Sequence, residues 1–262
     1  MARLARLDQS KKIADKKAYK RELDALQMTI LQIQQAYFRQ QRRGIIVLEG
    51  WDTAGKGGLI RRLGEHLDPR GFRVWPIGAP TPVEQGRHYL YRFWQKLPEP
   101  GSIVVFDRSW YGRVLVERVE GFAAPGEWRR AYDEINAFER LLTDDGVHMI
   151  KLFLHITPEE QLARFQARLE TPHKRWKLTE EDLRNRARWT DYVAAIEEMV
   201  ERTSPESARW HVIPANFKWY ARIEGLRRIA ATLGDGIDLA PPPADPDIAA
   251  AIEAMAAQEQ NQ

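Results

Sequence analysis

The chain has 262 residues and no cysteine, and its 40 basic and 37 acidic side chains leave a formal net charge of +3. This length fits one α/β domain with an accessory element. The lack of cysteine excludes a disulfide scaffold, a cysteine-ligated metal site and a thiol nucleophile. No apolar run reaches the roughly 18–20 residues of a membrane span, and the start lacks the apolar stretch of a signal peptide. We therefore expect a cytoplasmic protein with no membrane partner.

The charges are unevenly distributed along the chain. Residues 1–43 hold 11 basic and 4 acidic side chains, whereas residues 234–262 hold 6 acidic and no basic ones. The basic part indicates either a solvated surface or a polyanionic ligand, such as nucleic acid or a phosphate chain. Composition alone does not separate these two alternatives.

Hydrophobic periodicity predicts helices and strands in alternation. A helical pattern over about 8–43 is followed by a short apolar run that ends in glycines, and further strands and helices alternate after it. This order predicts an α/β fold with a mostly parallel five-stranded sheet flanked by helices. The strands are expected at 44–50, 71–77, 102–106, 148–156 and 209–214, and the later helices at 56–67, 83–96, 126–142, from 157 onward, 179–201 and 217–232.

Composition also divides the chain into three parts. We expect an N-terminal helical extension at 1–43, a core domain at 44–233 and an acidic, Pro- and Ala-rich tail at 234–262. The tail is expected to be either a poorly ordered extension or a short docking helix.

A phosphate-binding loop is predicted where the first strand meets the next helix. The run from Gly50 to Lys56 matches G-x-x-x-x-G-K, whose backbone amides surround phosphate while the lysine reaches the transferred group. A glycine-rich turn with a surface lysine is the alternative, and the strand–loop–helix context argues against it. The residues expected to surround phosphate are Gly50, Thr53, Ala54, Gly55, Gly57 and Gly58.

A divalent metal is predicted beside this loop, although Gly57 replaces the usual hydroxyl ligand after Lys56. Magnesium needs hard oxygen ligands, and Asp52 within the loop can supply one unless it only caps the loop amides. Asp107 ends the third predicted strand and can supply a second. The six histidines show no paired spacing typical of a metal site and are expected to be structural.

Two arginines follow the second carboxylate within one short loop. Arg108 and Arg113 can each hold phosphate oxygens through paired hydrogen bonds. An Asp107–Arg108 ion pair without further function is the alternative, which the nearby phosphate loop makes the weaker one. Trp51, Trp110 and Tyr111 could stack on a nucleotide base, but core packing is favoured for large aromatic residues.

A basic lid is predicted at about 164–190. Residues 164–188 contain eight Lys or Arg and four acidic residues, after the fourth strand and its helix, where nucleotide kinases have a mobile lid. A solvated helical hairpin is the alternative interpretation. The side chains expected to carry the charge of the lid are Arg164, Arg168, Lys174, Arg175, Lys177 and Arg188.

Taken together, these motifs resemble the polyphosphate kinase 2 family over about residues 10–232. The resemblance rests on the loop 50–58, on the segment 107–121, and on Arg164–Arg168 and 173–178 in the lid. The Gly-Gly pair after the loop lysine and the loop aspartate belong to the pattern of that family. The resemblance implies a thymidylate-kinase-like, P-loop NTPase-like fold with a helical lid.

The resemblance also implies a reaction and its participants. The reaction is reversible, Mg²⁺-dependent phosphoryl transfer between inorganic polyphosphate and a nucleoside mono- or diphosphate, with Mn²⁺ as an alternative ion. The enzyme would be a homo-oligomer such as a dimer or tetramer. Segments 110–121 and 214–222 look most like the type that converts AMP to ADP, although many members of that type carry two fused copies of the domain and this chain has one. In the matching positions, Asp52, Lys56 and Asp107 would form the catalytic centre with the metal, Arg108 and Arg113 would hold the acceptor, and Arg61 and Arg62 would contact polyphosphate.

Two other classes of function remain as alternatives. One is an ATP-dependent kinase on the same fold, and the other is a regulatory or polyanion-binding protein without catalysis. The pair of carboxylates beside a cationic lid favours an enzyme, because binding alone does not require it. We expect no nucleic-acid partner.

Overall fold

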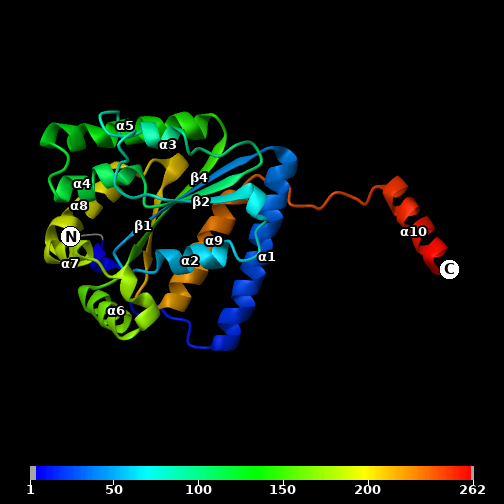
Figure 1. Cartoon of the computed structure of the whole chain (residues 1–262), viewed down its shortest axis with the longest axis horizontal. Coiled ribbons are helices and arrows are strands. Elements are labelled where there is room, and N and C mark those ends of the chain that lie inside the picture. Colours follow the sequence, from blue (N-terminus) through cyan, green and yellow to red (C-terminus); the bar gives the residue numbers. More distant parts are fainter. Residues whose placement is uncertain (1–3, 261–262) are drawn as a thin grey trace.

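A parallel five-stranded sheet with the order β2-β3-β1-β4-β5 forms the centre of the computed structural model (Figure 1). The structure describes residues 4–260, so residues 1–3 of the expected extension and 261–262 of the expected tail lie outside it. The five strands are β1 (Arg43–Gly50), β2 (Phe72–Pro76), β3 (Ile103–Asp107), β4 (Val147–His155) and β5 (Trp210–Pro214).

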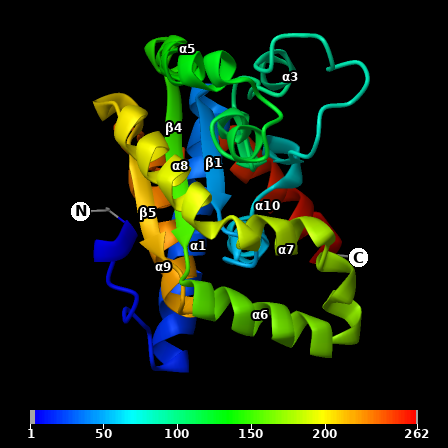
Figure 2. The same cartoon turned by 90° about the vertical axis from the view of Figure 1, so that its left-hand side faces the viewer.

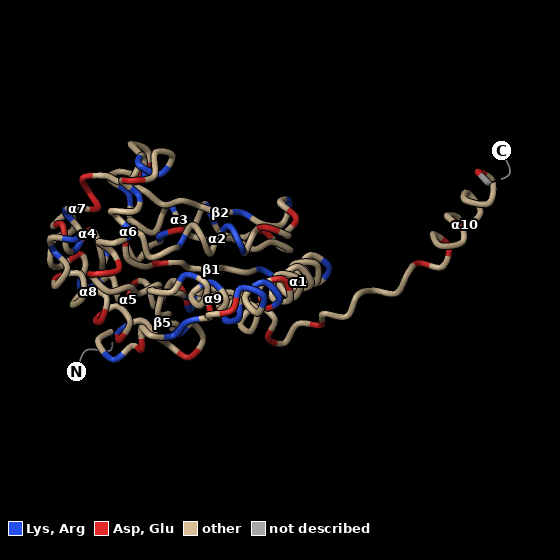
Figure 3. Tube along the Cα trace, turned by 90° about the horizontal axis from the view of Figure 1, so that it is seen from below, with Lys and Arg blue, Asp and Glu red and all other residues tan. Residues whose placement is uncertain are grey.

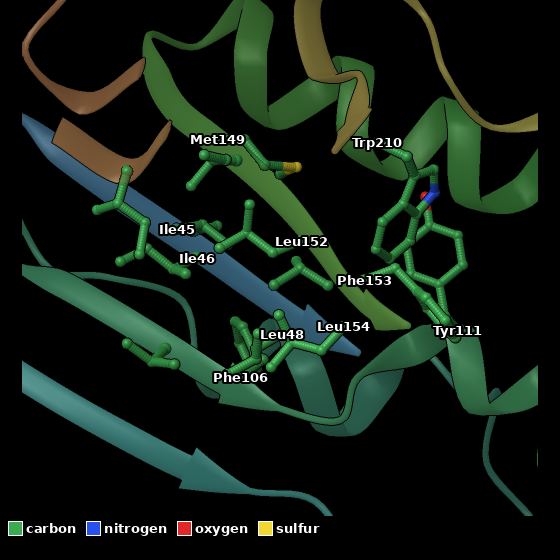
Figure 4. Close-up of a cluster of buried hydrophobic side chains, with 14 of the residues drawn as sticks. Ile45, Ile46, Leu48, Phe106, Tyr111, Met149, Leu152, Phe153, Leu154 and Trp210 are labelled. Carbon is green, nitrogen blue, oxygen red and sulfur yellow. The ribbon is translucent and has the colours of Figure 1, made fainter. Parts of the chain in front are cut away.

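Helices cover both faces of this sheet, which explains why its central strands are continuous apolar runs. Helices α1, α2 and α9 cover one face, and α3, α5 and α8 lie on the other (Figures 1 and 2). Ile45, Ile46 and Leu48 of β1 are at most 1% exposed, and they pack among side chains from β3 and β4 (Figure 4). The helices are α1 (Lys16–Gln40), α2 (Lys56–Leu63), α3 (Tyr91–Trp94), α4 (Val116–Val119), α5 (Pro125–Asp144), α6 (Pro158–Glu170), α7 (Glu180–Ala187), α8 (Trp189–Arg202), α9 (Lys218–Leu233) and α10 (Pro246–Gln260).

The structure corrects three of the predicted helices. The first helix begins at Lys16, because the Asp15 carboxylate caps it by accepting hydrogen bonds from the amides of the first turn. The helix expected at 83–96 is reduced to α3, since the chain turns at Gly86 with φ +73°. The helix expected at 179–201 breaks at Arg188 into α7 and α8.

The tail forms a helix that stands away from the rest of the molecule. An extended run of prolines leads from the end of α9 to α10, and both Figure 1 and Figure 3 show α10 clear of the sheet and its covering helices. The acidic residues of this part are also visible in Figure 3. The tail thus contains a helix, as one of the two alternatives expected, but this helix docks on no other part of residues 4–260.

A fully buried ion pair fixes the turn that follows β3. Lys151 Nζ on β4 lies 2.6 Å from Glu139 Oε2 on α5, and the two side chains are 0% and 1% exposed. The other oxygen of Glu139 accepts hydrogen bonds from Trp110 Nε1 (3.0 Å) and the Tyr111 hydroxyl (2.8 Å). Lys151 also donates to the Thr203 carbonyl at 2.8 Å. Because every charge here has partners, the pair is stable inside the core and anchors the turn at 109–113 to β4 and α5.

Removal of one partner of this pair is expected to destabilise the fold strongly. Lys151→Met leaves the Glu139 carboxylate buried without its counter-charge, which should lower the free energy of unfolding by about 3–5 kcal/mol. Urea denaturation checks this value. Adding Glu139→Gln should recover much of the loss, because the amide oxygen still accepts from Trp110. Glu206→Gln in the exposed Arg209–Glu206 pair is the control and should change stability by less than about 0.5 kcal/mol; an equally small loss for Lys151→Met would contradict the prediction.

Candidate active site

The loop between β1 and α2 has a backbone that few residue types adopt easily. Gly50 has φ +148°, and a Cβ at this position would lie 2.6 Å from the Leu154 carbonyl oxygen. Gly55 has φ +113°, and Thr53 has φ +66° despite its branched side chain. Glycine tolerates such a backbone and threonine is strained in it. Strain of this kind is typical of loops that bind a ligand.

Polar groups of the loop are available to a phosphate ligand. The Thr53 hydroxyl is buried and has no hydrogen-bond partner among residues 4–260. Lys56 Nζ donates to the carbonyls of Gly50 (2.6 Å) and Trp51 (3.2 Å), which keeps the ammonium inside the loop. A buried hydroxyl without a partner suits a phosphate oxygen that enters the loop. Thr53 thus places a hydroxyl in a loop that lacks one after Lys56.

Arg164 braces the loop, which corrects its predicted role in the lid. Its guanidinium has five N–H groups, and the partners account for all five. Nε donates to Glu160 Oε1 at 2.6 Å, Nη1 to the carbonyls of Thr53 (2.9 Å) and Ala54 (3.0 Å), and Nη2 to two carbonyls of the β5–α9 connection. The residue is 5% exposed. Arg164 has no donor left for a phosphate and instead fixes the backbone that binds one.

Helix α7, which lies within the segment predicted to form a lid, contacts the loop through Asp52. Asn185 Nδ2 donates to Asp52 Oδ2 at 3.0 Å, and Arg108 Nη2 donates to Oδ1 at 3.0 Å. Glu181 of α7 lies 3.6 Å from Arg108. Arg108 itself has a positive φ of 64°, directly after β3. The loop, the end of β3 and the lid therefore meet at one carboxylate.

Charges in this cluster shift one another's pKa. Burial alone would raise the pKa of Asp52, but Lys56 and Arg108 outweigh it and hold the pKa below its ordinary value. Burial lowers the pKa of Lys56, helped by Arg108 and opposed by Asp52. Burial raises the pKa of Glu49, which lies behind the loop and accepts a hydrogen bond from the Ser109 hydroxyl at 2.7 Å. Asp52 is therefore ionised near neutral pH.

The donor set fits a metal ion that is shared with a substrate. The negative charge of Asp107 acts on both Lys56 and Arg108, which places it in the same cluster as Asp52. Within the described part of the chain, no group of three His, Asp or Glu side chains could hold an ion by itself. Mg²⁺ bound with phosphate needs only one or two carboxylates, and phosphate oxygens and water complete its shell. Asp52 and Asp107 fit that role.

A cleft of about 430 Å³ lies beyond β3, with both predicted arginines in its lining. Arg113 Nε is 3.2 Å from the Glu117 carboxylate, and its guanidinium lies over the Tyr89 ring with 4.7 Å between the carbon and the centroid. Arg108 lines this cleft and also the small pocket at Asp52. Arg108 is thus shared by the small pocket at Asp52 and by this larger cleft, whose walls are both polar and aromatic.

A second, cationic pocket of about 310 Å³ lies on the outer side of the loop. Thr53, Ala54, Gly55 and Gly58 form one wall of it. The other walls carry five basic side chains that are not committed to the loop backbone, namely Arg168, Lys174, Lys177, Lys218 and Arg222. Three of these were predicted from the lid, and Lys218 and Arg222 come from α9. Lys218 and Arg222 are four residues apart on the helix that follows β5, and this spacing is the signal that could have identified them.

Other predicted residues lie outside these pockets. Arg61 and Arg62 are in the last turn of α2 and line neither pocket at the loop. Arg175 Nε donates to the Leu169 carbonyl at 2.6 Å, and Arg188 Nε lies 3.2 Å from Asp191. The structure therefore places these four arginines outside the lining of both pockets, and their contact with substrate stays a prediction.

The large aromatic residues near the loop pack in the core, as favoured from the sequence. Trp110 and Tyr111 are at most 1% exposed. Trp51 stacks on Trp189 of α8, with 3.6 Å between ring centroids and 5° between the planes. Its indole N–H donates to His155 Nδ1 at 2.8 Å. Trp51 therefore ties the loop to the lid side of the molecule.

The fold and the site define a class of protein. A G-x-x-x-x-G-K loop at the carboxyl edge of a parallel sheet, beneath a cationic helical lid, is the arrangement of kinase-like P-loop α/β proteins. The family model of polyphosphate kinase 2 (PPK2) matches residues 13–236. The chain belongs to the polyphosphate kinase 2 family.

Similar proteins agree with this assignment. A polyphosphate:AMP phosphotransferase of Pseudomonas aeruginosa is 49% identical over 227 residues, which are 86% of this chain and 45% of that protein. A GDP-polyphosphate phosphotransferase of Mycolicibacterium smegmatis is 41% identical over 211 residues, or 80% of this chain and 75% of that protein. The crystal structure of polyphosphate kinase 2 from Arthrobacter aurescens has a TM-score of 0.88 at 36% identity, and the match covers 96% of this chain and 92% of that one. The chain thus spans less than half the length of the Pseudomonas protein. None of the helices within residues 4–260 is long and apolar enough to span a bilayer.

Arg164 and Arg168 are one turn apart on α6, and we predict that their loss has different effects. Arg164→Lys cannot keep all five hydrogen bonds of the guanidinium, because an ammonium has three donors, so the melting temperature and phosphate binding should both fall. Arg168→Ala should leave the melting temperature within about 2 °C and weaken phosphate binding only. Calorimetry of unfolding and of polyphosphate binding separates the two. A stable Arg164→Lys variant with normal binding would contradict the bracing role.

Stability is expected to depend on pH through His155. Burial lowers the pKa of His155 to about 4. Between about pH 6.5 and 4, His155 is therefore protonated in the unfolded chain but not in the folded chain. The free energy of unfolding should consequently decrease as the pH falls through this range. His155→Gln should remove this part of the pH dependence while its side-chain oxygen can still accept from Trp51. Urea unfolding at several pH values measures the slope, and equal slopes in both proteins would refute the assignment.

Proposed function

We propose that the chain transfers a phosphoryl group between inorganic polyphosphate and a nucleotide, with AMP as the preferred acceptor and ADP as the product. The observation that carries this proposal is a pair of pockets at the phosphate loop: the loop itself lines the outer one, and the inner cleft shares Arg108 with the small pocket at Asp52. The outer pocket is lined by five basic side chains that make no hydrogen bond to the loop backbone, which suit a chain of phosphates. The inner cleft has aromatic walls and five arginines, Arg108 and Arg113 among them, which suit a phosphate joined to an organic group.

In the proposed mechanism, an acceptor phosphate oxygen attacks the terminal phosphorus of polyphosphate in line, and the P–O bond from this phosphorus to the rest of the polyphosphate chain breaks as the new P–O bond forms. Polyphosphate shortened by one phosphate leaves with the bond's electron pair on its new terminal oxygen. Such an oxygen is already anionic near neutral pH, so no general base is required. The protein contributes position and charge neutralisation. Lys56 and the loop amides hold the transferred group, and Arg108 and Arg113 hold the acceptor. The lid cations neutralise the donor chain.

Asp52 and Asp107 would hold a divalent cation, either Mg²⁺ or Mn²⁺. When bound, the ion would neutralise part of the negative charge of the phosphates. The low pKa of Asp52 keeps a full negative charge available for this role. We also infer that residues 164–190 form a lid on the domain at 44–233, that the extension at 1–43 and the tail are separate parts, and that the protein is a cytoplasmic homo-oligomer.

The choice of AMP follows the names of the more similar relatives. Proteins named polyphosphate:AMP phosphotransferase share 49–53% identity with the chain, and those named for GDP or ADP share 38–42%. Phosphorylation of nucleoside diphosphates is therefore the second candidate. Incubation with Mg²⁺, polyphosphate and, separately, AMP, ADP, GMP and GDP tests the choice when the products are separated by chromatography. Transfer that needs ATP and ignores polyphosphate would overturn the proposal.

Two substitutions test the proposed centre. Lys56→Ala and Asp107→Asn should each lower polyphosphate-driven ADP formation by at least about 10²–10³-fold, because each removes charge at the transferred group. The exposed α1 residues Lys20 and Asp24 provide matched controls, and Lys20→Ala and Asp24→Asn should keep normal rates. Near-normal turnover of Lys56→Ala or of Asp107→Asn, with an unchanged circular dichroism spectrum, would refute the assignment.

A further inference from the structure

The tail helix α10 carries an apolar stripe that no other part of residues 4–260 covers. Ile248, Ile252 and Met255 follow each other at spacings of four and three residues, so they share one face of the helix. They are 59%, 60% and 63% exposed. The family model matches residues 13–236, so α10 lies outside the residues that this model covers.

A groove of about 1050 Å³ lies at the opposite edge of the sheet from the phosphate loop. It is lined by the C-terminal part of α1 and by the segments that lead into β2 and β3. Leu31, Leu67 and Pro69 contribute apolar walls, and Phe38 is 71% exposed at its rim. Polar side chains, among them Gln35, Asp68 and Glu99, lie between these apolar walls. The groove therefore combines polar groups with apolar walls of the size that an apolar helix face can fill.

The tail reaches this groove but is directed away from it. Gln40 donates to the Asp238 carbonyl at 2.7 Å and Arg39 to the Ala240 carbonyl at 2.9 Å, which fixes the start of the tail along α1. Pro242 then lines the groove. The three prolines 241–243 form a stiff, extended segment, and only two residues separate it from Pro246, where α10 begins. A reversal of direction within so short a connection is unfavourable, so α10 projects from its own groove (Figure 1).

Charge also favours contact between the tail and the body of another copy. The tail from 234 onward has six acidic and no basic residues, while the rest of the chain is net basic. Arg39 at the groove makes no ion pair within residues 4–260 and has its charge free for a carboxylate. The acidic residues on α10 itself are Asp247, Glu253 and Glu259.

We propose that α10 docks its apolar stripe into the Phe38 groove of a second copy of the chain. The exchange is reciprocal, because each copy carries one helix and one groove, and it generates a twofold dimer with two identical contacts. Two contacts double the buried area, which brings the interface toward the roughly 1,200–2,000 Å² of stable complexes. The phosphate loops remain open, since the grooves lie at the other edge of the sheet.

The absence of cysteine allows a direct test by crosslinking in the full-length protein. Phe38→Cys and Ile252→Cys are prepared as separate chains of different mass, mixed and oxidised. The expected product is a disulfide-linked heterodimer that forms about tenfold faster than in a mixture of Leu141→Cys and Ile252→Cys. Leu141 is a matched control because it is 58% exposed on α5, away from the groove.

Each alternative arrangement gives a different result. If α10 docks on its own chain, the Phe38→Cys/Ile252→Cys double variant forms an internally crosslinked monomer and the mixture forms no heterodimer, which overturns the proposal. Equal rates for the mixture and the Leu141→Cys control also overturn it. Sedimentation of the chain without cysteine gives an independent check, because Phe38→Asp and Ile252→Asp should each weaken the dimer and their mixture should restore part of it through one intact contact. Phosphotransferase activity of these variants is measured separately, so its loss or absence does not affect the outcome.

Discussion

The guanidinium of Arg164 is the contact on which the phosphate loop depends. Its hydrogen bonds join three parts of the chain that are distant in sequence: the loop at Thr53, the start of α6 at Glu160 and the connection after β5 at Ala215. Buried arginine with all donors satisfied forms a rigid junction. The loop backbone, the cationic pocket and the base of the lid consequently keep fixed relative positions.

A second junction holds the opposite wall of the site. The buried Lys151–Glu139 pair anchors Trp110 and Tyr111, and this turn carries Arg108 and Arg113 at its two ends. Because the pair also bonds to the Thr203 carbonyl at the end of α8, it connects the acceptor side to the helix behind the lid. Each wall of the proposed site thus rests on buried charged side chains that have all their partners within the core. The basic side chains without such partners face the pockets.

Much of the fold followed from the sequence, because five apolar runs between helical patterns have few solutions other than a parallel sheet. The loop at 50–56 was also predictable, since its glycines are required locally. What the sequence could not show depends on tertiary contacts. Arg164 and Arg168 look alike in the sequence, and only the packing of α6 against the loop separates a brace from a free cation. Asn185 had no local signal at all, because its role arises where α7 meets Asp52.

The backbone of Thr53 and Arg108 has a consequence for the evolution of the site. Both residues occupy the left-handed region, which for a residue with a side chain costs about 1–3 kcal/mol. Glycine would relieve this strain, yet it would also remove the buried hydroxyl and the guanidinium that binds Asp52. The molecule therefore keeps two side chains at positions where glycine would give a less strained backbone. Selection for thermal stability alone would favour glycine there and would remove both functional groups from the site.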